Sequence, residues 1–339
     1  MKKNTFLHLI YLTAAIIFYY FIKGLDIGGV DIAYQKAFMR SNSINSFAYF
    51  TLTQGYPSIS LWIYYLLGNL IGITYGIAHA ILGILYIFKT IQISVLLKNQ
   101  FQNLNKNIFS ISLIIFFVFG QFGMQLLLSA EKMLIAMIFL LFALEANFKN
   151  QHRKKLIFYL LSFASHFTVI ITIYLLEYES IINSFKNFLN GLKKLKLRKL
   201  YIYITSLIFI ITSIGFTRIV AKAIRTLRNS SLDIDGSVEL SGASSSYILL
   251  ASSVFLIFFV LSKIKLKGLI SSFLSLLPIL IKLPLGRISW LYAFTVFLKP
   301  YILKSNIRLQ KIYIPYILSL SLFYLYKSIN IIQRGYLNG

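Results

Sequence analysis

The chain has 339 residues, of which 58% are hydrophobic and only 13% are charged. Soluble domains are typically about half apolar and a quarter charged, so this composition excludes a water-soluble globule. The 30 Phe and 23 Tyr exclude a disordered basic tail. The 34 Lys and Arg against 9 Asp and Glu give a formal charge of +25, which is typical of nucleic-acid binders. Because these cations lie between long apolar runs, we expect a membrane protein and no nucleic-acid partner.

The apolar runs predict an all-α, polytopic bundle, with residues 1–339 forming a single transmembrane domain. A bilayer core of about 30 Å needs roughly 20 apolar residues per helix, which gives about 10–12 spans. The candidate spans in chain order are 5–22, 56–72, 75–97, 108–124, 130–148, 156–183, 200–217, 247–262, 268–282, 288–304 and 312–327.

Basic clusters predict the orientation, because loops rich in Lys and Arg stay in the cytoplasm. The clusters are Lys2 and Lys3, Lys98–Lys106, Lys149–Lys155, Lys186–Lys199, Lys263–Lys267 and Lys299–Lys311. The segments then expected to face outward are the long loops 23–55 and 218–246 and the short ones 125–130 and 282–287.

Counting crossings predicts two irregular segments. The chain must cross the membrane once between the outward loop 23–55 and the cytoplasmic cluster at Lys98, yet two apolar segments lie between them. One of 56–72 and 75–97 is therefore expected to be re-entrant or interfacial. The run 156–183 has basic clusters on both sides but is too short for two full spans. A short helix 156–165, a turn near Ser165 and His166, and a return helix 167–183 would satisfy the charges. Irregular backbone at this depth requires a protein or water-filled surrounding, so His166 is expected in a cavity open to the outside.

Acidic residues are few enough to inspect one by one. Glu131 stands beside Lys132 at the start of a span, either as a functional group or as a partnered structural charge. Glu145 lies near the cytoplasmic end of the same span. Asp233 and Asp235 have the spacing of a metal-binding pair, but two acids at this spacing recur by chance in polar loops. We therefore expect no metal and no cofactor.

The nine arginines are distributed differently from the 25 lysines. Five of them fall on segments expected to face outward, which the positive-inside bias would deplete. A guanidinium grips phosphate with two hydrogen bonds, so these arginines predict a phosphate-containing ligand. The alternative is anchoring to lipid headgroups. The five are Arg40, Arg218, Arg225, Arg228 and Arg287, of which Arg287 follows a Pro-Leu-Gly break between two apolar runs.

His166 is the histidine flanked by small and hydroxyl-bearing residues inside a span. Imidazole titrates near neutrality and can accept a proton from an attacking hydroxyl. A lone histidine is also commonly a structural hydrogen-bond donor, and that alternative stays open here. His8 and His79 are weaker candidates, since little besides Tyr75 accompanies them in sequence.

The order of several short motifs along nearly the whole chain resembles the EpsG-like proteins, relatives of the Wzy-type O-antigen and capsule repeat-unit polymerases. The motifs are Gly28-Gly29-Val30-Asp31-Ile32-Ala33-Tyr34 with Phe38, Gln54-Gly55-Tyr56, the span from Gln125 to Ala136, Ala164-Ser165-His166-Phe167-Thr168, and Gly286-Arg287-Ile288 with Tyr292. Two departures stand out. Gln54 replaces a family Glu, and the family's Arg-Gln element has Ser129-Ala130-Glu131-Lys132 in its place.

The resemblance implies a GT-C-like bundle with re-entrant or short helices around an outward-facing cavity. It implies an inverting glycosyltransferase that joins undecaprenyl-diphosphate-linked oligosaccharides into O-antigen or capsular polysaccharide at the periplasmic face of the bacterial inner membrane. His166 or Asp31 would be the general base, the five arginines would hold the diphosphate, and Tyr34, Tyr56 and Tyr292 would contact sugars. The expected partners are the lipid-linked oligosaccharides, membrane lipid and a protein that regulates chain length. The alternative is a flippase or transporter for a lipid-linked glycan.

Overall fold

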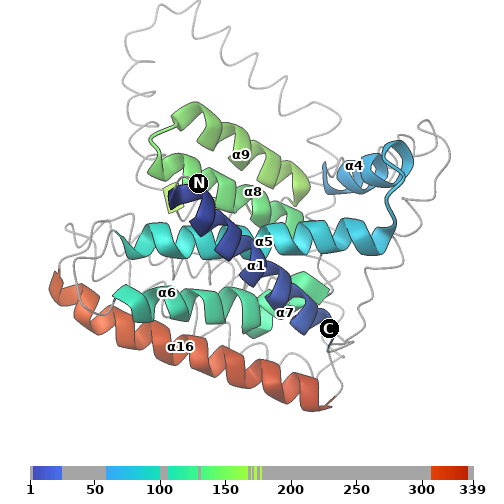
Figure 1. Ribbon diagram of the computed structural model, residues 1–339. Helices are drawn as coiled ribbons and strands as arrows, with labels where there is room; N and C mark the ends of the chain where they lie inside the picture. The colour runs from blue at the N-terminus through green and yellow to red at the C-terminus, as the bar shows by residue number, and fades with distance from the viewer. Residues whose placement is uncertain are drawn as a thin grey trace, which may run out of the picture. The chain divides into compact units, whose positions relative to one another are not determined.

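The computed structural model describes residues 3–24, 59–99, 106–128, 131–166 and 307–334, with single positions at 169, 172–173 and 176–177. All regular structure in these ranges is helical (Figure 1). The elements are α1 (Lys3–Lys23), α4 (Ile59–Tyr65), η1 (Leu66–Leu70, a π-helical turn), α5 (Tyr75–Lys98), α6 (Lys106–Ile114), η2 (Ile115–Phe119, also π-helical), α7 (Gln121–Leu128), α8 (Glu131–Phe148), α9 (His152–Ser165) and α16 (Ile307–Arg334).

The chain divides into two compact units. The first consists of Met1–Phe50, Pro57–Val169 and Leu303–Gly339, and it contains every helix named above. Within the described ranges, two helices are long and apolar enough to cross a membrane, the segment Phe6–Lys23 of α1 and the whole of α5. A third crossing is added if α6, η2 and α7 together form one bent span. The all-helical prediction is confirmed for this part of the chain.

Helix α1 runs antiparallel to α5. The His8 ring lies 6.2 Å from that of Phe88, and the Tyr19 ring lies 6.2 Å from that of His79. Close packing at this crossing depends on Gly83, where a Cβ atom would overlap the Tyr19 ring. Small residues let helices approach in membrane proteins, where lipid tails are as apolar as the side chains.

Helices α6 and α16 continue the same bundle. The Ser110 hydroxyl on α6 donates to Ser94 Oγ on α5 at 3.0 Å, and the Ser321 hydroxyl on α16 donates to the Ser112 carbonyl at 2.8 Å. The ring of Tyr324 packs on Phe116 and Phe122 at 5.1 and 4.6 Å. These contacts place α16 parallel to α6 and antiparallel to α5.

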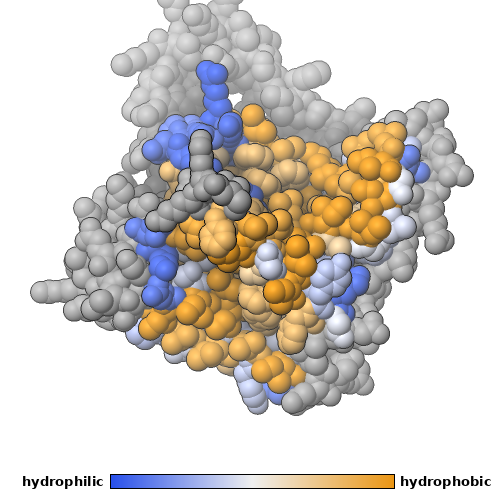
Figure 2. All heavy atoms as spheres, in the orientation of Figure 1, coloured by the Kyte–Doolittle hydropathy of each residue, from blue (hydrophilic) through white to orange (hydrophobic). Residues whose placement is uncertain are grey.

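The lysine-rich helix ends therefore lie together, at the left in Figure 1. We call this the basic end; it is where α1 and α6 begin, α5 ends and α8 turns into α9. The opposite end, called the far end, carries the last turn of α1, the first of α5, the start of α8 and the last turn of α9. Figure 2 shows apolar side chains over the middle of this view, with hydrophilic ones at the left, toward the basic end, and others at the right. The side of the membrane that the basic end faces stays a prediction.

Helix α6 does not continue smoothly into α7. The Gly120 N–H bonds to the Ile115 carbonyl at 2.7 Å, and the axis bends by 43° between Asn107–Phe119 and Gln121–Leu128. A Cβ at Gly120 would overlap the carbonyl oxygen of Phe116, and a Cβ at Gly123 would overlap that of Phe117, on the other side of the break. The buried Tyr86 hydroxyl donates to the Phe117 carbonyl at 2.9 Å, so this bond crosses from α5 to the bent segment. Breaks in membrane helices persist where a neighbour satisfies the backbone.

This break corrects one expectation. Residues 125–130 were predicted as an outward loop, but 125–128 are the second half of α7. The break lies at Gly120, inside the predicted span 108–124, where a side chain larger than glycine would overlap the Phe116 backbone. The apolar run Phe122–Leu128 hides this break from a hydropathy argument.

Helices α8 and α9 form a tight antiparallel hairpin. Asn150 adopts a left-handed conformation (φ 55°) and the Gln151 N–H bonds to the Ala146 carbonyl at 2.8 Å, which is a Schellman-type helix end. The hairpin is held farther along by Phe142 stacking on Phe158 at 5.2 Å. Because the turn is only a few residues long, the two helices must lie side by side.

Candidate functional site

Of the predicted site residues, the structure describes His166. Those that lie outside the described residues are Asp31, Tyr34, Arg40, Tyr56, Arg218, Arg225, Arg228, Arg287 and Tyr292. The loops 23–55 and 218–246 lie outside as well, except for the first two residues of the former. The site is therefore built from the far end of the first unit.

His166 caps the end of α9. Its backbone is extended (φ −154°, ψ 110°), and its N–H still bonds to the Ser162 carbonyl at 3.0 Å. The side chain is partly exposed. Helix α9 thus ends at Ser165, where the sequence predicted a turn; most of the predicted return helix 167–183 lies outside the described residues.

The hydroxyls beside His166 are directed to backbone carbonyls. Ser162 Oγ donates to the Ala136 carbonyl at 2.7 Å, and Ser165 Oγ donates to the Leu161 carbonyl at 2.8 Å. Both serines are buried. The Ser162 bond joins α9 to α8, whereas the Ser165 bond lies within α9 itself.

The depth of His166 follows from the length of α9. A rise of 1.5 Å per residue puts it about 21 Å from the basic first turn at His152, against a hydrocarbon core of about 30 Å. An α9 that starts at one membrane surface therefore ends inside the membrane.

The hairpin register brings another predicted position to the same end. Because Ser162 lies opposite Ala136 in antiparallel helices, position 166 comes level with about position 132. The backbone of Glu131 and Lys132, the first turn of α8, therefore lies at the end of the hairpin that carries His166. Sequence reasoning treated these two segments separately.

A second histidine at the far end has partners that the sequence did not reveal. His79 is buried, with Nε2 2.6 Å from the Leu127 carbonyl and Nδ1 3.4 Å from the Tyr64 hydroxyl. A carbonyl can only accept, so Nε2 carries the proton and Nδ1 accepts from Tyr64. The Tyr75 ring stacks on both, 5.9 Å from His79 and 5.8 Å from Tyr64.

This histidine holds a short helix. Helix α4 with η1 covers Ile59–Leu70, at most about 18 Å and too short to cross a bilayer. The chain then turns at Gly72 (φ 75°) and enters α5, while α4 also contacts α8 and α9. Of the two segments 56–72 and 75–97, the first is the short one, as a re-entrant or interfacial segment requires.

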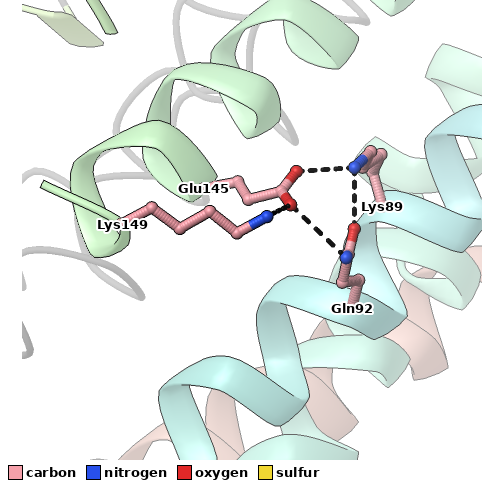
Figure 3. Close-up of polar contacts among 4 residues, drawn as sticks. All are labelled: Lys89, Gln92, Glu145 and Lys149. Carbon is pink, nitrogen blue, oxygen red and sulfur yellow. Dashed lines mark hydrogen bonds and ion pairs between the residues drawn. The ribbon is translucent and has the colours of Figure 1, made fainter. Parts of the chain in front are cut away.

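Among the residues that the structure describes, Lys89, Gln92, Glu145 and Lys149 form a charged cluster at the basic end (Figure 3). Lys89 Nζ is 2.6 Å from Glu145 Oε2 and 2.7 Å from Gln92 Oε1, and it lies 4.3 Å from the centre of the Phe142 ring. Lys149 Nζ is 2.6 Å from the other carboxylate oxygen of Glu145. Lys89 and Glu145 are buried. These contacts join α5 to α8.

Neither a metal-binding group of side chains in the described ranges nor a similar known protein was found to identify the site. The part of the chain that the structure describes has no group of three His, Cys, Asp or Glu side chains placed to hold a metal. No protein-family model, no curated protein and no solved structure matches the chain.

Proposed function

We propose that the chain is a polytopic, GT-C-like membrane glycosyltransferase of about 10–12 spans. It polymerises undecaprenyl-diphosphate-linked oligosaccharide repeats into O-antigen or capsular polysaccharide at the periplasmic face of the bacterial inner membrane. The motif order from Asp31 to Tyr292 supports this assignment, and so does the scarcity of arginine outside the segments expected to face outward.

One observation carries the proposal. His166 ends a shortened helix at the far end of a hairpin whose other end is rich in lysine. If the basic end faces the cytoplasm, His166 lies toward the periplasmic side and within the membrane. A lipid-linked substrate presents its diphosphate and first sugars at the outer surface, and the expected outward-facing cavity would connect that surface with His166.

The proposed reaction is a displacement at the anomeric carbon. His166, or Asp31, removes the proton from an acceptor hydroxyl as it attacks. The C–O bond to the lipid diphosphate breaks with inversion, and the diphosphate leaves as an anion. Stabilising that charge is the main electrostatic task, which we assign to Arg287 with Arg40, Arg218, Arg225 and Arg228. Tyr34, Tyr56 and Tyr292 would stack on the sugars.

The test is complementation of a deletion strain, with gel analysis of its surface polysaccharide. His166→Ala and Arg287→Ala should each leave single repeat units attached and no long polymer. His152→Ala, an exposed histidine at the other end of α9, is the matched control and should restore normal ladders. Normal ladders from both site variants would contradict the proposal. Loss of even the single repeat unit in the deletion strain would instead indicate a flippase.

A further inference from the structure

Helix α9 has two different faces. One packs on α8, through the Phe158 ring on Phe142 and the Ser162 hydroxyl on the Ala136 carbonyl, and Tyr159 is buried on the same side. These contacts fix the rotation of α9 about its own axis. The opposite face is therefore turned away from α8.

That opposite face is an unbroken stripe. Arg153, Leu156, Ile157 and Leu160 occupy positions i, i+3, i+4 and i+7, which places them on one side of a helix. The three apolar side chains are 60%, 53% and 58% exposed, and Arg153 is exposed as well. The stripe covers two turns, about 10 Å along the helix.

At its N-terminal end the stripe borders on the positively charged first turn of α9. This turn carries Arg153 and Lys154 with their neighbours His152 and Lys155, and it has no acidic residue. The described acid nearest in sequence, Glu145, is bonded to Lys89 and Lys149. In Figure 2 the hydrophilic start of α9 borders directly on the apolar surface along the same helix. Arg153 and Lys154 have no carboxylate partner among the residues that the structure describes.

We propose that this stripe binds an anionic phospholipid. Arg153 and Lys154 pair with the headgroup phosphate, and an acyl chain lies along Leu156, Ile157 and Leu160. Guanidinium and ammonium groups recognise phosphate, and basic residues beside a membrane helix favour anionic over zwitterionic lipid. A soluble phosphate or a nucleic acid would leave the three apolar side chains unused. The site lies at the opposite end of the hairpin from His166, so it does not depend on the proposed catalysis.

The experiment uses the full chain in vesicles with a fluorescent reporter beside the stripe. Trp62 and Trp290 are the two tryptophans of the sequence. Replacing both by Phe and adding Leu156→Trp gives one reporter at a position that is already exposed. Its quenching is measured against the mole fraction of brominated phosphatidylglycerol and, separately, of brominated phosphatidylcholine. We expect stronger quenching by the anionic lipid at every equal mole fraction.

Charge variants decide the origin of that preference. Arg153→Gln with Lys154→Gln should weaken the preference by roughly 30-fold, from about 1 kcal/mol for each cation near an anionic surface. Arg153→Lys with Lys154→Arg keeps the charge and should keep the preference. Lys23→Gln removes an exposed lysine at the far end and is the matched control, expected to have no effect. Equal quenching by the two lipids, or an unchanged preference in the double glutamine variant, would overturn the proposal.

Discussion

Lys89 on α5 and Glu145 on α8 form a buried ion pair, with Nζ 2.6 Å from Oε2. Both residues lie within apolar helices, where a charge is costly unless it is paired. Lys89 also donates a hydrogen bond to Gln92 and lies over the ring of Phe142, and Glu145 forms a second ion pair with Lys149. The pair therefore fixes how α5 and α8 lie against each other, which in turn fixes where the hairpin end with His166 is placed.

Removing the carboxylate should be strongly destabilising. Glu145→Ala leaves Lys89 as a buried charge without its counterion, and breaking a buried pair in this way costs about 3–5 kcal/mol. We expect a clear fall in Tm when the purified protein is unfolded thermally in detergent and followed by circular dichroism. An unchanged Tm would show that the pair does not join the two helices.

Two further variants separate the buried pair from its exposed neighbour. The Lys149 side chain is 54% exposed and lies one turn after Glu145, so Lys149→Ala should cost only about 0.3–0.5 kcal/mol. The double variant Lys89→Met with Glu145→Leu removes both charges and should recover most of the stability lost in Glu145→Ala. A double variant as unstable as the single one would point to packing instead of charge.

The sequence predicted the helices better than their interactions. The apolar run 75–97 predicted α5 almost to the residue, because an apolar run of this length without Pro has few alternatives to a helix. Lys89 was missed as a partner of Glu145, since the two lie 56 positions apart and no local pattern links them. The break at Gly120 was missed for a related reason: it depends on close approach between backbone atoms, which hydropathy does not contain.

The hydrogen bond from Tyr86 on α5 to the backbone of the bent segment can be tested for its contribution to stability. Tyr86→Phe removes the donor to the Phe117 carbonyl, and we expect a loss of about 0.6 kcal/mol, with about 1.7 as the upper end for such bonds in membranes. The measurement is the free energy of unfolding in detergent. Tyr20→Phe is the matched control, because Tyr20 is 61% exposed, and it should change nothing. Equal effects from both variants would show that the bond contributes no stability.

The close crossing of α1 and α5 predicts an effect from a single methyl group. Gly83→Ala places its Cβ into the buried ring of Tyr19, and overpacking of this kind costs about 1–3 kcal/mol. Gly76→Ala, in the first turn of the same helix, meets no atom within 4 Å and should stabilise by about 0.4–1 kcal/mol. Opposite shifts in Tm are expected. Shifts of the same sign would contradict this account of the crossing.

The predicted site was only partly accessible to sequence reasoning. His166 was placed at the end of a short helix by counting charges on either side of 156–183, and α9 does end there. His79 was rated weak, yet its partners Tyr64 and Leu127 come from segments 15 and 48 residues away. Only the folded arrangement brings these three together, so a signal for them would have to come from long-range contacts.

His79 supplies the last prediction, since it links α5 to α4 and to the end of α7. His79→Phe keeps the ring but removes the donor to the Leu127 carbonyl, and leaving that buried acceptor without its donor should cost about 1–3 kcal/mol. His79→Gln places an amide N–H near the position of Nε2 and should recover part of the loss. Because α4 is held through Tyr64, hydrogen exchange should rise at Ile59–Leu70 in the Phe variant before it rises in α8. Exchange that rises equally in both segments would show that His79 stabilises the bundle as a whole instead of the short helix.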